Sequence, residues 1–178
     1  MYPVLRLIWQ MFKHRNDPQL ALTGTHVSRH MCMPWDIDLW MELNNGRTLT
    51  LFDLGRIPLA QRVGLIPALK HNKWGLVVAG ASVRYRRRIK AFEVIEMRSR
   101  AVWWDDKFIY IEQSMWKDSG ECANHILLRT AVTGKTGMVP PDQVMAAVGQ
   151  NIARPDAPDW VQDWITADAK RPWPPMQE

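Results

Sequence analysis

The chain of 178 residues is long enough for one domain with a full core, and we expect a single domain over residues 1–178. Its formal net charge of +5 at pH 7 favours anionic partners such as phosphates, nucleic acid or a membrane surface, unless the charge only forms a solvated basic face. The five His show no metal-binding spacing and the two Cys form no CxxC motif, so a zinc site is not expected. Two thiols far apart in sequence suit a reducing cytoplasm, which is the predicted location.

The N-terminal residues predict a helix over positions 3–14, with Pro3 in its first turn and the charged Arg6 interrupting its apolar stretch. That stretch is shorter than the ~20 residues that a bilayer-spanning helix requires. Two roles remain open for the helix. It either packs on the domain as an amphipathic element, or makes weak membrane-surface contact through Trp9, Phe12 and the flanking basic residues.

A long buried helix is predicted over residues 46–62, directly after the turn signal Asn44-Asn45-Gly46. Apolar residues cover most of its circumference, and a helix of this kind is typically buried on all sides. Asp53 and Arg56 are the exceptions, and their spacing of three residues allows them to form an ion pair. Pro58 is expected to kink or end the regular helix.

Five β-rich runs predict strands at 20–35, 75–88, 92–104, 107–117 and 121–133. The breaks between the last four are short, which favours antiparallel hairpins. Two later segments, 141–151 and 158–168, begin with Pro-Asp and predict short helices in a C-terminal extension over 141–168. The order of elements predicts an α+β fold with an antiparallel sheet of about five strands wrapped round the central helix, and a core over about residues 20–135.

The segment between the first strand and the buried helix concentrates polar groups: Asp36, Asp38, Glu42, Asn44 and Asn45. Asp and Asn in a loop commonly cap turns and helices. The same groups also suit thioester hydrolysis. A partly buried carboxylate can attack the carbonyl carbon or activate water, and N–H groups at a helix start stabilise the charge that develops on oxygen.

This segment resembles the signature of the hotdog-fold thioesterase superfamily of the 4-hydroxybenzoyl-CoA thioesterase type, which reads D-x-D followed by N-N-x-R. The matching residues, in order, are Asp36, Asp38, Asn44, Asn45, Arg47, Leu49, Asp53 and Arg56. Downstream, the GAS-x-RYRR run, the FEV strand start and the WDD triplet resemble the subgroup named for the sixth member of the thioesterase superfamily. The resemblance covers roughly residues 25–150.

The resemblance implies a hotdog fold, a homodimer or homotetramer, and acyl-CoA or acyl-carrier-protein thioesters as substrates, with no metal or organic cofactor. It places the nucleophile or general base at Asp38 and the helix start that polarises the carbonyl at Asn44 and Asn45. The sequence departs from the pattern at Met41, where many relatives have Gly, and at Glu42, where they have His. The predicted function is an acyl-CoA thioesterase, and the alternative is a non-catalytic acyl-thioester or lipid-binding protein of the same fold.

The densest basic cluster of the chain is formed by Arg84, Arg86, Arg87 and Arg88. If the strand continues through it, Arg84, Arg86 and Arg88 share one face. CoA carries phosphate groups that Arg binds well, so the cluster and Glu42 are the candidate substrate-binding residues. A solvated strand end or ion pairs across a dimer are the alternatives. Nucleic-acid binding is not expected, because the aromatic residues fit strand cores better than a stacking platform.

Overall fold

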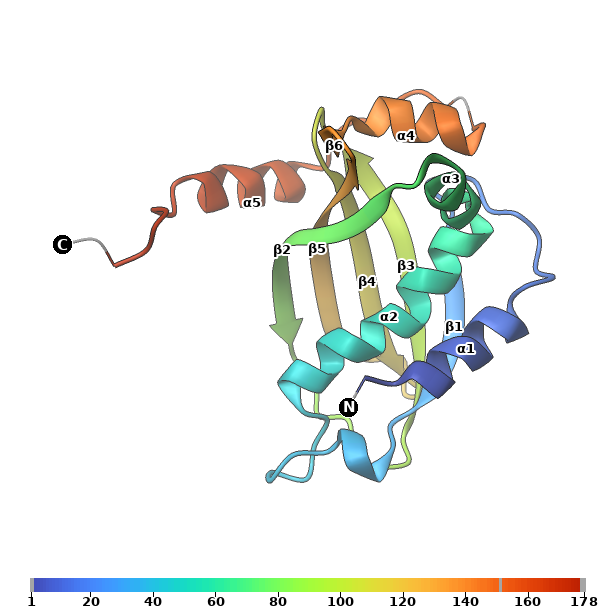
Figure 1. The fold of residues 1–178 in the computed structure, drawn as a ribbon. Helices are drawn as coiled ribbons and strands as arrows, with labels where there is room; N and C mark the ends of the chain where they lie inside the picture. The colour runs from blue at the N-terminus through green and yellow to red at the C-terminus, as the bar shows by residue number, and fades with distance from the viewer. Residues whose placement is uncertain (1, 151, 177–178) are drawn as a thin grey trace.

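A single antiparallel sheet curls around one long helix in the computed structural model, which describes residues 2–150 and 152–176 (Figure 1). The helix α2 (Asn45–Arg62) lies across the concave face. The strand order is β1-β3-β4-β5-β2, with the short β6 paired to β5. The strands are β1 (His26–Met31), β2 (Gly75–Tyr85), β3 (Val94–Trp104), β4 (Ile109–Lys117), β5 (Cys122–Gly134) and β6 (Gly137–Val139). This arrangement confirms the expected α+β fold.

The observed elements differ from the predicted ones mainly at their ends. The first strand is only six residues long, because the segment 20–24 turns, with Gly24 N donating to Ala21 O at 2.8 Å. Helix α3 (Leu65–Asn72) was not predicted. The two C-terminal helices, α4 (Pro141–Val148) and α5 (Asp159–Ala169), lie where short helices were expected, although position 151 of the first prediction falls outside the described residues. Helix α2 continues past Pro58, so this proline does not end it.

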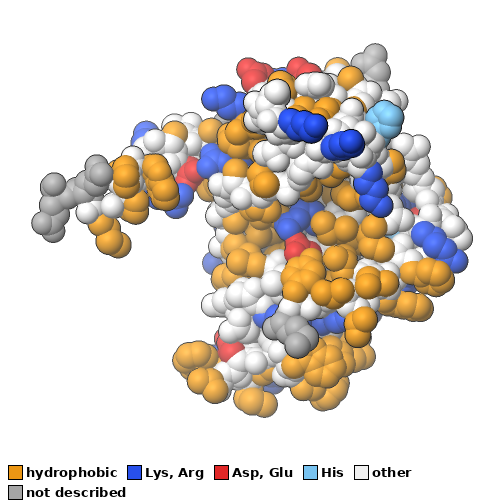
Figure 2. All heavy atoms as spheres, viewed as in Figure 1, with side chains coloured by type: hydrophobic (Ala, Val, Ile, Leu, Met, Phe, Trp, Pro, Cys, Tyr) orange, Lys and Arg blue, Asp and Glu red, His pale blue; other side chains and the backbone are white. Residues whose placement is uncertain are grey.

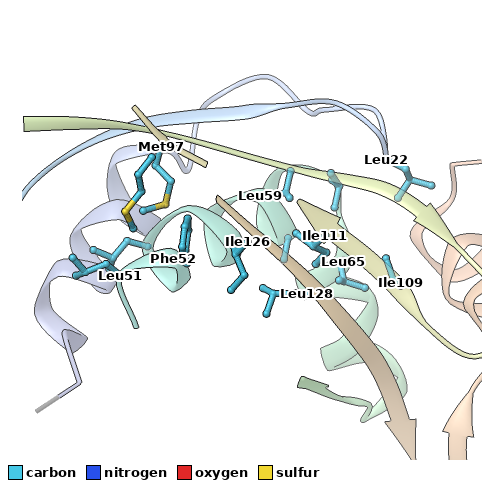
Figure 3. Packing of buried hydrophobic residues seen from close by; sticks show 14 of the residues in the cluster. Leu22, Leu51, Phe52, Leu59, Leu65, Met97, Ile109, Ile111, Ile126 and Leu128 are labelled. Atoms are coloured by element: carbon cyan, nitrogen blue, oxygen red, sulfur yellow. The ribbon is translucent and has the colours of Figure 1, made fainter. Parts of the chain in front are cut away.

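The core is formed where α2 packs on the concave face of the sheet. Leu51, Phe52 and Leu54 are fully buried, and Figure 3 shows the first two beside Met97 of β3 and Ile126 of β5. The buried amide of Gln113 joins the two layers, because its Nε2 donates to the backbone oxygen of Phe52 at 2.8 Å. The predicted helix therefore is the centre of the fold.

The helix backbone approaches the sheet closely at Gly55. A Cβ atom at this position would lie 2.6 Å from Met97 Sδ and 2.6 Å from Ser99 Oγ, which is too short for any real contact. Ser99 has little freedom to move, because its Oγ accepts a hydrogen bond from Gln113 at 2.8 Å. A glycine is needed here because only a residue without a side chain lets the helix backbone approach β3 this closely.

Helix α1 (Val4–Lys13) packs against α2 at the edge of the domain. Its main attachment is polar. Arg6 Nη1 lies 2.7 Å from Asp36 Oδ2, and its Nη2 donates to Met31 O at 2.8 Å. None of the helices in the described ranges has both the length and the apolar character needed to cross a bilayer.

Asp36 ties three elements together. Its carboxylate is fully buried and accepts hydrogen bonds from Arg6, from Arg47 Nε at 2.6 Å, and from the backbone N–H of Met33 at 3.1 Å. Burial by itself would raise the pKa of Asp36. The hydrogen bonds from Arg47, Met33 and Arg6 outweigh burial and hold this pKa below its usual range. The first Asp of the D-x-D pair is thus an anchor that fixes α1 and the loop 34–44 on the start of α2.

We expect Asp36→Asn to lower the free energy of unfolding by about 3 kcal/mol, because it leaves the Arg6 and Arg47 guanidinium groups without their buried counter-charge. Since the pKa of Asp36 is lower in the folded than in the unfolded chain, its contribution is complete above ~pH 4 and is lost as the pH falls through the folded value. Urea unfolding between pH 7 and pH 3 measures both effects.

The matched control is Asp118→Asn, because Asp118 is an exposed carboxylate that pairs with Arg29 on the surface. A change within about 0.5 kcal/mol is expected there. Equal losses of unfolding free energy in the two variants would show that Asp36 is not an anchor.

Candidate active site

The loop that precedes α2 folds back on itself in two tight turns. Residues Pro34–Asp36 form a turn of 3-10 helix, and Ile37 pairs with Leu43 in an isolated antiparallel bridge. Between them, Met41 N donates to Asp38 O at 3.1 Å, and Met41 adopts φ 59°. This left-handed conformation is natural for glycine and costs another residue on the order of 1 kcal/mol. The turn geometry therefore explains why glycine suits this position in the pattern that the sequence resembles.

Asp38 stands at the base of this turn with a half-buried side chain. Its Oδ1 accepts a hydrogen bond from Trp40 N at 2.9 Å, while its Oδ2 has no hydrogen-bond partner within the described part of the chain. The backbone N–H of Asp38 donates to Glu42 O at 2.9 Å. One oxygen of the carboxylate thus stabilises the turn, and the other is available to a ligand or to water.

The start of α2 lies directly after this loop. Asn44 caps the helix, because its side-chain oxygen accepts a hydrogen bond from Arg47 N at 3.0 Å. The N–H groups of Asn45 and Gly46 lie in the first turn, where the helix itself offers no acceptor. They carry the positive end of the helix dipole. This end of α2 is therefore suited to stabilise an oxygen atom that acquires negative charge during a reaction.

Beside the helix start is a depression of about 200 Å³ that gathers five of the eight predicted site residues. Its lining includes Glu42, Asn45, Arg86, Arg87 and Arg88. Two of the cations already have carboxylate partners within it or at its rim. Arg88 Nε lies 2.9 Å from Glu42 Oε2, and Arg87 Nε lies 2.8 Å from Glu121 Oε1. Arg86 forms no ion pair with any residue that the structure describes, which leaves its guanidinium group available to an anion.

The predicted arrangement of the arginines on one strand face is wrong. Strand β2 ends at Tyr85, because Arg86 N and Arg87 N both donate to the same oxygen, Ala123 O, at 2.8 and 3.2 Å. The chain leaves the sheet at that point. Arg84 stays on the convex face, where it lines a separate hollow of about 440 Å³ with His125 and Trp160. The basic run is therefore divided between two surfaces.

The sequence analysis missed two polar residues of the depression, Tyr85 and Asn124. Tyr85 donates its hydroxyl hydrogen to Asn45 O at 3.1 Å and so connects the end of β2 to the start of α2. Asn124 lies opposite Tyr85 in the β2–β5 register. The place of Tyr85 inside the basic run was a usable signal. Asn124 is 39 positions away in sequence, and only the strand register brings it to the site.

Three histidines are buried elsewhere, under α1: His14, His26 and His30. Burial, assisted by nearby positive charge, lowers the pKa of His26 to about 4 and that of His30 to about 3, so both rings are neutral at pH 7. His30 Nε2 lies 2.8 Å from Ser28 Oγ. Within the described ranges, no three His, Cys, Asp or Glu side chains are placed to hold a metal ion together.

Comparison with known proteins identifies the relatives of this chain. The model of the thioesterase-like superfamily matches residues 32–165. Protein THEM6 of Xenopus laevis is 31% identical over 158 residues, which cover 87% of this chain and 74% of the relative. A DHNA-CoA thioesterase from Staphylococcus aureus superposes with a TM-score of 0.60 at 13% identity, covering 82% of this chain and 91% of that one.

A second Staphylococcus aureus protein, solved in complex with CoA, superposes with a TM-score of 0.62 at 10% identity and covers 80% of this chain and 95% of that one. Identities this low show the fold alone, and that fold is the hotdog. The superfamily match begins at Cys32, directly after β1, and extends through the other five strands into α5. It includes both the D-x-D segment and the depression. On these grounds the chain belongs to the thioesterase-like superfamily and, within it, to the family that includes Protein THEM6.

Proposed function

We propose that this protein is an acyl-CoA thioesterase in which Asp38 activates the attacking water molecule. The supporting observation is the depression beside the N-terminus of α2. It combines Arg86, which forms no ion pair with a described residue, with a helix start next to the D-x-D loop. Asp38 is one backbone hydrogen bond, of 2.9 Å, away from Glu42 in the lining of that depression. In this proposal the anionic end of CoA lies against Arg86. A Staphylococcus aureus protein of the same fold was solved in complex with CoA, which supports CoA as the ligand class.

The chemistry follows from these positions. The Oδ2 atom of Asp38 accepts a proton from water, and the water oxygen forms a bond with the thioester carbon. The first-turn N–H groups of α2 stabilise the negative charge on the carbonyl oxygen. The carbon–sulfur bond then breaks, and the proton held by Asp38 passes to the leaving thiolate. The products are a free acid and CoA.

We expect Asp38→Asn to reduce hydrolysis of acyl-CoA by at least ~10²-fold, because an amide cannot accept the proton. The Asn side-chain oxygen still accepts the hydrogen bond from Trp40 N, so the turn should be retained. The assay is release of free thiol across a series of acyl-chain lengths, with thermal unfolding of the variant to verify that it is folded.

Glu42→Gln is the matched control for this carboxylate, because Glu42 is the acid of the loop that lines the depression. Undiminished turnover of Asp38→Asn together with loss of turnover in Glu42→Gln would transfer the catalytic role to Glu42. Loss in neither variant would exclude both Asp38 and Glu42 as the catalyst.

A second candidate function is binding of acyl thioesters without hydrolysis. Two observations favour it: the Glu42 carboxylate is already paired with Arg88, and one oxygen of Asp38 is engaged by Trp40 N. Both functions use the same depression, so both predict that acyl thioesters bind there. They differ in whether the bound thioester is hydrolysed. Binding of a non-hydrolysable acyl-CoA analogue to a protein that releases no thiol would identify this alternative.

If Arg86 binds a phosphate group of CoA, then Arg86→Ala should weaken CoA binding by about 1–3 kcal/mol. Arg84→Ala is the matched control, because Arg84 also forms no ion pair with a described residue but lines the separate hollow on the convex face. Calorimetry with CoA and with a pantetheine thioester that lacks the nucleotide distinguishes the cases. The Arg86 effect should be specific to CoA, and an equal loss for both ligands would contradict phosphate binding.

We further propose that the active form is a homodimer that pairs through β2. This edge strand is 11 residues long and exposes Val77 and Val78, whereas the opposite edge, β1, has six residues. A long apolar edge invites strand pairing. We expect light scattering to show a dimer that Val77→Arg weakens, because symmetry brings like charges together. Val27→Arg on β1 is the control, since Val27 and Val77 are both 45% exposed. A monomeric parent protein would refute this assembly.

A further inference from the structure

Helix α1 gathers most of its apolar residues on one face, although Leu7 packs against the core from the other. The apolar residues Val4, Leu5, Ile8, Trp9 and Phe12 follow the helical period and form one face. The polar residues Arg6, Gln10 and His14, spaced four apart, form the other. A surface helix of a soluble domain normally turns its apolar face toward the core.

Here the orientation is reversed. Gln10 and His14 are buried, whereas Leu5 is 83% exposed and Ile8 and Trp9 are each 59% exposed. Figure 2 shows apolar side chains along the right and lower margins of this view, where α1 and the loop 34–44 lie in Figure 1. The structure therefore presents to its surroundings the very residues that the hydrophobic effect would otherwise bury.

Polar contacts fix this orientation. Arg6 is bound to the buried carboxylate of Asp36, and His14 Nδ1 lies 2.7 Å from Asp17 Oδ2. Asp17 in turn lies 3.6 Å from Arg62 at the end of α2. A rotation of the helix about its axis that buried its apolar face would break these contacts. The charged groups would then lose the partners that they have in this orientation. The outward apolar face is thus built into the fold.

The exposed surface continues beyond the helix. A hollow of about 570 Å³ is lined by the first residues of α1 together with Trp35, which is 67% exposed. The next turn of the loop, which begins at Asp38, exposes Leu39, Trp40 and Met41. Trp35, in the same loop as Asp38, therefore shares one hollow with the first residues of α1.

The charges around α1 indicate what covers it. The sequence contains no Asp or Glu before Asp17, whereas Lys13 and Arg15 are exposed at the end of the helix. The Arg15 guanidinium carbon lies 3.6 Å from the centroid of the Phe12 ring, so positive charge directly borders the apolar face. A helix with Trp, Phe and aliphatic residues on one face and cations at its margin is typical of segments that lie in the interface of an anionic membrane.

We propose that α1 and Trp35 form a docking surface for anionic lipid membranes. Ile8, Trp9 and Phe12 enter the boundary between headgroups and acyl chains, and Lys13 and Arg15 contact the lipid phosphates. The loop that carries Asp38 is then held close to the membrane surface. This inference does not depend on the proposed hydrolysis, because a binding protein would dock in the same way.

Co-sedimentation with phosphatidylcholine vesicles, with and without phosphatidylglycerol, tests the docking surface. We expect the protein to bind the anionic vesicles and to be released by salt. The double substitution Ile8→Glu/Trp9→Glu should lower partitioning at least about tenfold, and Lys13→Glu/Arg15→Glu should remove the preference for anionic lipid. Hydrolysis of a water-soluble short-chain acyl-CoA should be unchanged in both variants, which separates docking from catalysis.

Two control variants match these changes. Met138→Glu alters an apolar residue of β6 that is 51% exposed, and Lys107→Glu/Lys135→Glu reverses two exposed charges elsewhere. Both should bind vesicles like the parent protein. Absence of vesicle binding, or equal loss in the α1 and control variants, would overturn the proposal. If the parent protein does not bind vesicles and light scattering shows that Ile8→Glu/Trp9→Glu forms a smaller oligomer than the parent, the face is instead covered by a second copy of the chain.

Discussion

The contact between the backbone of α2 and strand β3 at Gly55 determines where everything else in this fold can lie. No side chain fits between the two layers at this point, and Gln113 joins them with hydrogen bonds to Phe52 O and Ser99 Oγ. The helix axis is therefore fixed relative to the sheet. Because α2 is long and straight enough to cross the sheet, its N-terminus emerges beside the end of β2. The depression at the candidate active site exists because these two ends meet there.

The charge of Asp36 also fixes elements at the surface of the domain. A buried carboxylate needs positive partners, and here they come from α1 and from the first turn of α2. The same pair of contacts fixes the loop that carries Asp38 and fixes the face that α1 turns outward. One anchoring group thereby positions both the candidate catalytic residue and the candidate membrane surface. Of the two aspartates in the D-x-D pair, the first is structural, and the second has one carboxylate oxygen that no described residue contacts by a hydrogen bond.

The residues of the basic run lie on different surfaces of the protein. Where β2 leaves the ladder after Tyr85, Arg86 and its neighbours turn toward the start of α2, while Arg84 remains on the convex face. Within the depression most positive charge is already balanced by Glu42 and Glu121. A ligand would therefore meet a nearly neutral surface with one available guanidinium group at Arg86, and not a broad field of positive charge. Such a site selects ligands by where their negative charge lies, since the available positive charge is placed at a single position.

The sequence by itself determined most of the elements and their order: the buried helix from its apolar circumference, the four long strands from their composition, and the thioesterase resemblance from the D-x-D and N-N-x-R spacing. These features are local, so periodicity and short motifs report them. Only the tertiary structure separated Arg84 from Arg86, brought Asn124 to Tyr85, and made an anchor of Asp36. It also decided that α1 turns its apolar face outward. These outcomes depend on partners distant in the chain, because burial and ion pairing are set by what a residue meets after folding.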